Sequence, residues 1–414
     1  MSNFVVKRQF NGLLGTGIAA TVISVIAALF FWPVWASLAK SFITALAGPA
    51  IQAAGPKLGM QYVTLFAEGT FFFMVINSWI WQMLVFGGYG KTYMTTKQPY
   101  VGIWYVGVAL AAGLSFLLVF AGFLGIWWKP FSLSTMFMPK NAAEVHLAVE
   151  GWELINFYTL PVLLVQIPFV SLLQKWPFAG NIKAPWDGYG VFMASTAVAV
   201  LVWMGTVLTS LVTLQLGGHD VALKPFGSWP AYLAFAQAYI WTLLIPAEGG
   251  EQYPMKLFAK KQPYMGLVGF VIALIGGFVI PEILRPFAAS LGTGLPVNVV
   301  VTSLEISVIT LTLIWHHLFD DYPTAQMVPN TATRVLTRIG IWIVGGLAFG
   351  VFWIKTFKLI PFGASDMGMG YPLAGPIAGQ FVLIMMVVLL NTHFEKWPLV
   401  RKVPVDPADA GETK

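Results

Sequence analysis

Cysteine is absent from this chain of 414 residues, and charged side chains make up only 10% of it. Without cysteine there is no disulfide framework and no thiolate ligand for a metal. Soluble domains carry roughly a quarter charged residues, so the low charge content excludes an ordinary soluble enzyme. Hydrophobic residues make up 57% of the chain, which excludes intrinsic disorder. The class that remains is an integral membrane protein.

Several sequence motifs that would indicate a particular catalytic or nucleotide-binding function are also missing. The sequence has no Gly-x-x-x-x-Gly-Lys-Ser/Thr phosphate loop, no dinucleotide glycine fingerprint after a predicted strand and no Gly-x-Ser-x-Gly elbow. ATP-driven transport by this chain alone is therefore excluded, and no cofactor is assigned. The net charge of +6 is spread along the chain, so it favours contact with anionic lipid over nucleic-acid binding.

Long runs without a charged residue predict ten membrane-spanning helices. A spanning helix needs about 20 mostly apolar residues, and 31 residues separate Arg8 from Lys40 without a charge. The predicted spans are Leu13–Leu38, Tyr62–Phe86, Val101–Trp128, Val145–Leu173, Gly190–Leu216, Trp229–Pro246, Met265–Ile283, Pro296–Trp315, Ile339–Ile354 and Pro372–Leu390. The expected fold is an all-α integral membrane protein with one polytopic domain over residues 1–414.

The distribution of Lys and Arg predicts the orientation. With the N-terminus inside, 15 of the 23 Lys and Arg residues fall in cytoplasmic segments and 8 in outer ones. Positive residues favour the cytoplasmic side, so we expect both termini there, with residues 403–414 as a short polar cytoplasmic tail. The pattern favours a cell membrane, in particular a bacterial inner membrane.

A short motif occurs twice. Residues 97–102, Lys-Gln-Pro-Tyr-Val-Gly, match residues 261–266 at five of six positions. Aromatic-proline pairs follow other even-numbered spans, at Trp176-Pro177, Tyr322-Pro323 and Trp397-Pro398. Because all these sites fall on the predicted inner face, they indicate a parallel duplication of helix hairpins. The alternative is that an aromatic-proline pair simply ends a helix at the interface.

Ionisable residues inside the spans are few, and each one is a candidate for a solute or ion pathway. A charge in hydrocarbon costs at least about 2.5 kcal/mol, so such groups face a partner or a cavity. The candidates are Glu305 and Glu68, the amides Asn77, Gln237 and Gln380, and the aromatic residues Trp81 and Trp241. Gln237, Glu305 and Gln380 lie 17 or 18 residues before a junction proline, which predicts a common depth. Alternatively, the polar side chains only join helices by hydrogen bonds.

A second polar cluster lies at the ends of two spans. It consists of His316, His317, Asp320 and Asp321 after the eighth span, with His393 and Glu395 after the last. Imidazoles and carboxylates together hold metal ions or relay protons. The alternative is a solvated helix terminus. We make the same solvated interpretation for Glu150 and Glu153 in the first turns of the fourth span.

Two hypotheses of function follow. The first is a secondary transporter or permease for a small solute, coupled to protons through Glu305. The second is a membrane-embedded redox or enzyme subunit, binding a quinone or a metal at the His/Asp cluster. The expected partners are the lipid bilayer and a small-molecule solute, with a homo-oligomer or a membrane complex as further partners, and no nucleic acid.

Overall fold

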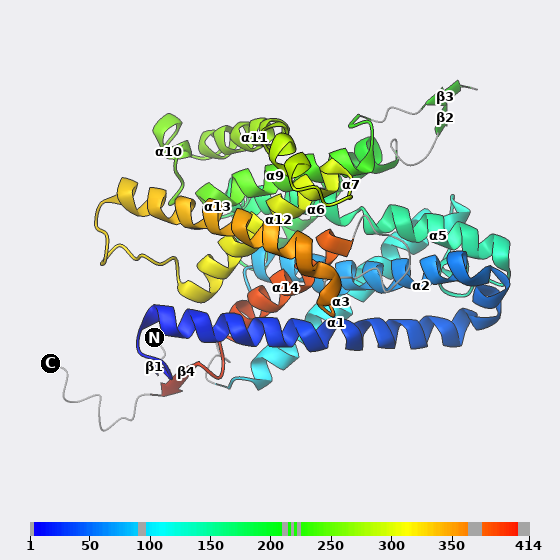
Figure 1. The fold of residues 1–414 in the computed structure, drawn as a ribbon, viewed down its shortest axis with the longest axis horizontal. Helices are drawn as coiled ribbons and strands as arrows, with labels where there is room; N and C mark the ends of the chain where they lie inside the picture. Colours follow the sequence, from blue (N-terminus) through cyan, green and yellow to red (C-terminus); the bar gives the residue numbers. More distant parts are fainter. Residues whose placement is uncertain are drawn as a thin grey trace.

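The computed structural model describes residues 4–89, 97–208, 214–216, 219–221, 225–362 and 375–404. Most of these residues are helical, and most helices run along the longest axis of the molecule (Figure 1). Within the described ranges, eight helices are long and apolar enough to cross a membrane. The structure thus has the architecture of an all-α, multi-pass membrane protein.

Five helices form an outer layer. They are α1 (Gly12–Ala53), α3 (Tyr100–Leu124), α7 (Trp186–Trp203), α11 (Tyr264–Ser290) and α13 (Thr331–Thr356). In each of these helices, at most 33% of the residues in the most apolar segment are buried. Their exposed side chains include large apolar ones such as Phe30, Ile275 and Val344, as expected for helices in contact with lipid.

The inner layer consists of the second helix of each successive pair. Its members are α2 (Gly55–Phe71) with the π-helices η1 (Phe72–Asn77) and η2 (Ile80–Val85), α5 (Ala142–Asn156) with α6 (Thr159–Ser171), α9 (Trp229–Ala247), α12 (Val297–Phe319) and α14 (Gly375–Thr392). Between 72% and 89% of the apolar stretch is buried in the three inner members that are long and apolar enough to span. The core therefore lies among these inner helices.

Short elements connect the long helices. They are η4 (Lys129–Phe131), α4 (Leu133–Phe137), η5 (Met204–Leu208), β2 (Leu214–Leu216), β3 (His219–Val221), α10 (Met255–Phe258) and η6 (Phe357–Leu359). Strands β2 and β3 pair antiparallel. They lie at the opposite end of the molecule from the chain termini (Figure 1).

The two ends of the described chain meet in a small sheet. Strand β1 (Phe4–Arg8) pairs antiparallel with β4 (Val400–Pro404), with Arg8 opposite Val400. We call the end of the molecule that carries this sheet the terminal end; it lies at the left in Figure 1. Two residues of the predicted polar tail, 403 and 404, belong to β4. Residues 405–414 of that tail lie outside the described residues.

The helix bounds differ from the predicted spans in several places. Helix α13 begins at Thr331, eight residues before the predicted Ile339, and residues 214–216 at the end of the fifth predicted span form strand β2. Helix α1 continues past Leu38 to Ala53, because Lys40 is exposed and does not end the helix. The fourth span is divided into α5 and α6 between Asn156 and Thr159. Residues 372–374 of the last predicted span lie outside the described residues. Helices α9 and α14 are not among the eight long apolar helices, so the count of ten spans stays a prediction.

All inner-layer helices end at the terminal end in the same type of turn, which we call the junction turn. Two consecutive residues have positive φ in each, at Gly87-Gly88, Gln174-Lys175, Glu251-Gln252, Asp320-Asp321 and Glu395-Lys396. The N–H of the second residue donates to the carbonyl six residues earlier, over 2.8 to 3.3 Å, and an aromatic residue follows. All eight non-glycine residues with positive φ in the described chain lie in these turns. Positive φ is uncommon outside glycine. The junction turn is therefore a distinct backbone conformation that recurs at the end of each inner-layer helix.

Close packing between α12 and α13 gives a prediction about stability. A Cβ added at Gly346 would lie 2.5 Å from the Cα of Val308, whereas a Cβ at Gly340 of the same helix meets nothing within 4 Å. Overpacking typically costs about 1–3 kcal/mol. We expect Gly346→Ala to lower the free energy of unfolding in mixed detergent micelles by that amount. Gly340→Ala is the matched control, and an equal loss in both variants would contradict this packing.

Candidate functional site

Two cavities lie among the inner helices, one on each side of a shared constriction. The proximal cavity, nearer the terminal end, has a volume of about 200 Å³ and is lined by residues of η1, η2, α6, α9, α12 and α14. The distal cavity has a volume of about 100 Å³ and is lined by α2, η1, α5, α6, α9 and α14. Leu163 of α6 and Phe381 of α14 line both cavities. These two side chains therefore form the constriction between them.

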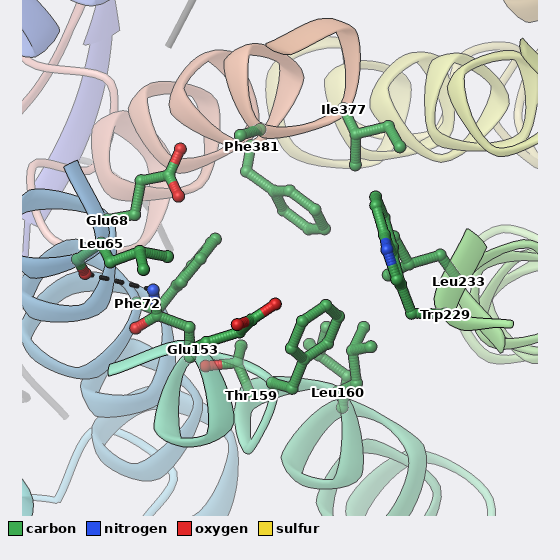
Figure 2. A pocket seen from close by; sticks show the side chains of 14 residues that line it. Leu65, Glu68, Phe72, Glu153, Thr159, Leu160, Trp229, Leu233, Ile377 and Phe381 are labelled. Atoms are coloured by element: carbon green, nitrogen blue, oxygen red, sulfur yellow. Dashed lines mark hydrogen bonds between the residues drawn. The ribbon is translucent and has the colours of Figure 1, made fainter. Parts of the chain in front are cut away.

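The distal cavity combines carboxylates with aromatic rings (Figure 2). Glu68 reaches it from α2 and Glu153 from the last turn of α5, and the carboxylate of Glu153 points into the cavity (Figure 2). The aromatic walls come from Phe72, Phe157, Trp229 and Phe381. The division of the fourth span between α5 and α6 occurs beside this cavity, at Asn156 and Thr159.

The proximal cavity is mostly apolar but has a polar floor at the terminal end. Gln237, Glu248, His316 and His317 contribute to its lining. His316 lies between two carboxylates, with Nε2 2.7 Å from Glu248 and Nδ1 3.0 Å from Asp321. Because ionised carboxylates only accept hydrogen bonds, this arrangement requires a proton on both ring nitrogens. The floor thus holds a cationic ring between two anions.

The contact with His316 lowers the pKa of Glu248. Burial alone would raise the pKa of Glu248, but the charge of His316 and its hydrogen bond lower that pKa below the ordinary value of 4.5. A carboxyl with a lowered pKa stabilises the fold above its unfolded-state pKa, and this contribution is lost as pH falls through the folded-state pKa. The stabilisation is therefore fully present above pH 4.5.

We expect His316→Gln to destabilise the protein at pH 7 by about 1–3 kcal/mol, because two charge-assisted hydrogen bonds disappear from a partly buried site. The difference from the unmodified protein should shrink as pH falls below 4.5, where Glu248 takes up a proton. Unfolding in mixed micelles from about pH 2.5 to pH 7 measures this, because the loss occurs between the unfolded-state pKa and the lower folded-state pKa. His146→Gln, at an exposed position, is the control. A difference that is constant across this pH range would contradict the pairing.

The other residues of the predicted His/Asp cluster lie apart from the cavity. Asp320 pairs with Lys396 at 2.5 Å and with Arg8 at 3.6 Å, and Glu395 pairs with Lys402 at 3.0 Å. The first of these ion pairs joins two junction turns, and the other two join junction turns to the strands β1 and β4 at the chain ends.

The remaining imidazoles also have partners. His393 is buried, with Nε2 2.9 Å from Oε1 of Gln82 and Nδ1 3.0 Å from the Thr392 hydroxyl. Nδ1 of His317 lies 2.9 Å from the side-chain amide of Asn391. Among the described residues there is no group of three or more His, Asp or Glu placed to hold a metal ion. The predicted cluster is thus divided among separate contacts.

Glu305 is fully buried in α12. Neither of its carboxyl oxygens has a hydrogen-bond partner among the described residues. It lies four residues before Ile309 and eleven before His316, which places all three on one face of the helix, and the latter two line the proximal cavity. Glu305 itself lines neither cavity. It is an intramembrane acid one helical turn beyond the cavity wall.

The predicted amides differ in their contacts. Gln237 lines the proximal cavity, and its Nε2 has no partner among the described residues. Gln380 instead joins α14 to α12: its Oε1 accepts from the Ser307 hydroxyl at 2.9 Å and its Nε2 donates to the Ser303 carbonyl at 3.0 Å. Asn77 is buried, and neither amide atom has a partner within the described ranges. Gln380 therefore serves helix packing, and Gln237 faces the cavity.

The predicted tryptophans lie away from both cavities. Trp81 donates to Oε1 of Gln166 at 2.8 Å and lines a separate groove between α3 and α7. Trp241 is buried and lines neither of the two cavities. The neighbouring Trp79 and the more distant Trp229 line the proximal and distal cavities instead.

Sequence reasoning missed most of the distal cavity. Glu153 was assigned to a solvated helix terminus, and Trp229, Leu163 and Phe381 carry no local signal. Glu248 follows Pro246 at the end of α9, and a proline next to an intramembrane helix end is a recognisable signal. No protein-family model matches this chain, and no solved structure matches it.

Proposed function

We propose that this chain is a secondary transporter for a small solute, with a path along the axis of the inner helices. The observation that carries the proposal is the pair of cavities enclosed by these helices and separated by Leu163 and Phe381. A pair of cavities with one shared constriction suits alternating access, in which a solute site opens to one side of the membrane at a time.

The ionisable side chains support transport coupled to protons. Glu68 and Glu153 line the distal cavity, Glu248 and His316 line the proximal one, and Glu305 is buried beside its wall. Ionisable groups are rare in hydrocarbon and mark ion pathways and proton relays. In this proposal Glu305 exchanges a proton when the solute site changes its access.

The proposal includes the orientation, the location and the origin of the fold. The excess of Lys and Arg in the segments at the terminal end supports a cytoplasmic location of that end in a bacterial inner membrane. The recurrence of the junction turn after each inner-layer helix supports an origin by parallel duplication of helix hairpins. Ten spans, with one outer and one inner helix per hairpin, follow from that origin.

The alternative function, a redox or enzyme subunit, has less support. Both ring nitrogens of His316 face carboxylates, and those of His393 face Gln82 and Thr392. Their contacts are those of structural hydrogen bonds. The metal content of the purified protein and its content of bound quinone, extracted and measured by ultraviolet absorption, distinguish the two functions, because the redox hypothesis requires one or the other.

The test of the transport function uses liposomes that contain the purified protein and a trapped pH-sensitive dye. Amines, carboxylates, sugars and alkali cations are added from outside in turn. We expect at least one class to change the internal pH faster than in protein-free liposomes. If no class does so under either direction of an imposed pH gradient, the proposal is wrong.

A further inference from the structure

We propose that the distal cavity binds a protonated amine with an apolar body. The cavity is the space in Figure 2 between Glu153, Phe72, Trp229 and Phe381. This inference rests on the proposed function in treating the cavity as the solute site of the transporter. It adds the chemical class of the solute, which four observations support.

The first observation is charge. Glu68 and Glu153 line the cavity, and none of its described lining residues is Lys, Arg or His. Carboxylates that line an intramembrane cavity favour a positive ligand and repel an anion. An organic anion is therefore disfavoured in this space.

The second observation is the arrangement of the aromatic rings. Phe157 and Trp229 form one pair, with ring centroids 6.0 Å apart at 59°. Phe72 and Phe381 form another, with centroids 6.3 Å apart at 89°. The pairs come from different helices and bound the same cavity. Aromatic faces attract organic cations, and tryptophan does so most strongly.

The third observation is a polar oxygen atom of a lining residue. The Thr159 hydroxyl is buried and has no hydrogen-bond partner among the described residues. Thr159 is 5% exposed and lines the cavity. A hydroxyl oxygen accepts hydrogen bonds. An ammonium group that carries N–H donors therefore suits it better than a quaternary one.

The fourth observation is the apolar remainder of the wall. This part of the wall consists of Leu65, Leu160, Leu163, Leu233, Ile377 and Ala378. These side chains offer no hydrogen bonds to a sugar or to another strongly polar solute, whereas an aliphatic or aromatic body buries well against them. Together the four observations specify a cationic head with N–H groups on an apolar body.

Binding of 2-phenylethylammonium tests this inference. Equilibrium dialysis or calorimetry with the full chain in detergent measures its affinity beside two analogues of similar shape, the neutral 2-phenylethanol and the anionic phenylacetate. We expect the ammonium to bind at least about tenfold more tightly than either analogue. Equal or weaker binding of the ammonium would overturn the inference.

Variants locate the binding site. We expect Glu153→Gln and Trp229→Ala each to weaken 2-phenylethylammonium binding at least about tenfold. The matched controls are Glu282→Gln, in an exposed pair with Arg285, and Trp104→Ala, on the exposed face of α3. An effect of the same size in the controls would place the ligand elsewhere and contradict the proposal.

This experiment separates the two proposals. Binding in detergent requires no transport, so a protein that binds the ammonium and moves no solute would overturn the transport function and leave the cation site. A protein that moves another class of solute and does not prefer the ammonium would overturn only the cation site. The comparison of the analogues uses the unmodified chain, so it holds even where a variant fails to fold.

Discussion

Glu305→Gln is expected to lower solute-driven proton flux by at least about a hundredfold, in the range found when a positioned acid or base is removed. Glutamine keeps the size and polarity of the side chain but carries no exchangeable acidic proton. Glu305 is fully buried next to the wall of the proximal cavity, and its oxygens have no hydrogen-bond partner among the described residues. The measurement is the initial rate of pH change in dye-loaded liposomes, driven by the solute that is most active with the unmodified protein.

Two further variants distinguish coupling from folding. Glu305→Asp keeps the acidic proton and should retain part of the flux, whereas Glu282→Gln changes an exposed carboxylate and should leave the rate unchanged. All three should elute from size exclusion like the unmodified protein. If Glu305→Gln moves protons at the full rate with the same pH dependence, Glu305 is not the coupling residue.

Phe381→Ala is expected to raise the proton leak in the absence of solute at least about tenfold, which corresponds to a barrier lower by about 1.4 kcal/mol. Phe381 lines both cavities, so truncating its ring removes part of the wall that separates them. The leak is measured as the decay of an imposed pH gradient, with valinomycin and potassium to clamp the membrane potential.

A larger side chain at the same constriction should narrow the path between the two cavities. Leu163→Trp adds bulk beside Phe381 and should reduce solute-driven flux without raising the leak. Phe352→Ala is the matched control, because Phe352 is exposed on the outer helix α13. A leak in Phe352→Ala equal to that of Phe381→Ala would mean that the truncation acts through general loosening of the bundle.

The fold class was predictable because it depends on local composition. Runs of apolar residues between charges fix which segments are helical, and the aromatic-proline pairs at Trp176, Tyr322 and Trp397 mark where inner helices end. The end of α1 was not predictable in this way. Lys40 was treated as a boundary, but its side chain is exposed and the helix continues to Ala53.

The candidate site was predictable only in part, because it is assembled from distant segments. Glu68 was identified from its own position, since any carboxylate inside a span is a candidate. The distal cavity joins Glu68 to Glu153, Trp229 and Phe381, and their proximity depends on helix packing that no short pattern encodes.

Local backbone geometry explains one specific difference between the predicted residues and the cavity lining. Trp81 was predicted to shape the solute site, but Trp79 lines the proximal cavity instead. Both residues lie in or beside the π-helical segments η1 and η2. A π-helix bonds residue i to i+5, so the face on which a side chain lies departs from the period of 3.6 that sequence reasoning assumes.

The accessibility of single cysteines to water tests the central claim, the axial pathway, most directly. The chain contains no cysteine, so each variant carries one thiol only: Leu313→Cys in the proximal cavity, Leu233→Cys in the distal one and Leu267→Cys on the exposed face of α11. A charged, membrane-impermeant thiol reagent is added to one side of oriented liposomes. The pathway predicts reaction at Leu313→Cys from the terminal end, at Leu233→Cys from the other side, and at Leu267→Cys from neither. If the two cavity positions are as unreactive as Leu267→Cys from both sides, no aqueous path follows the axis and the account is wrong.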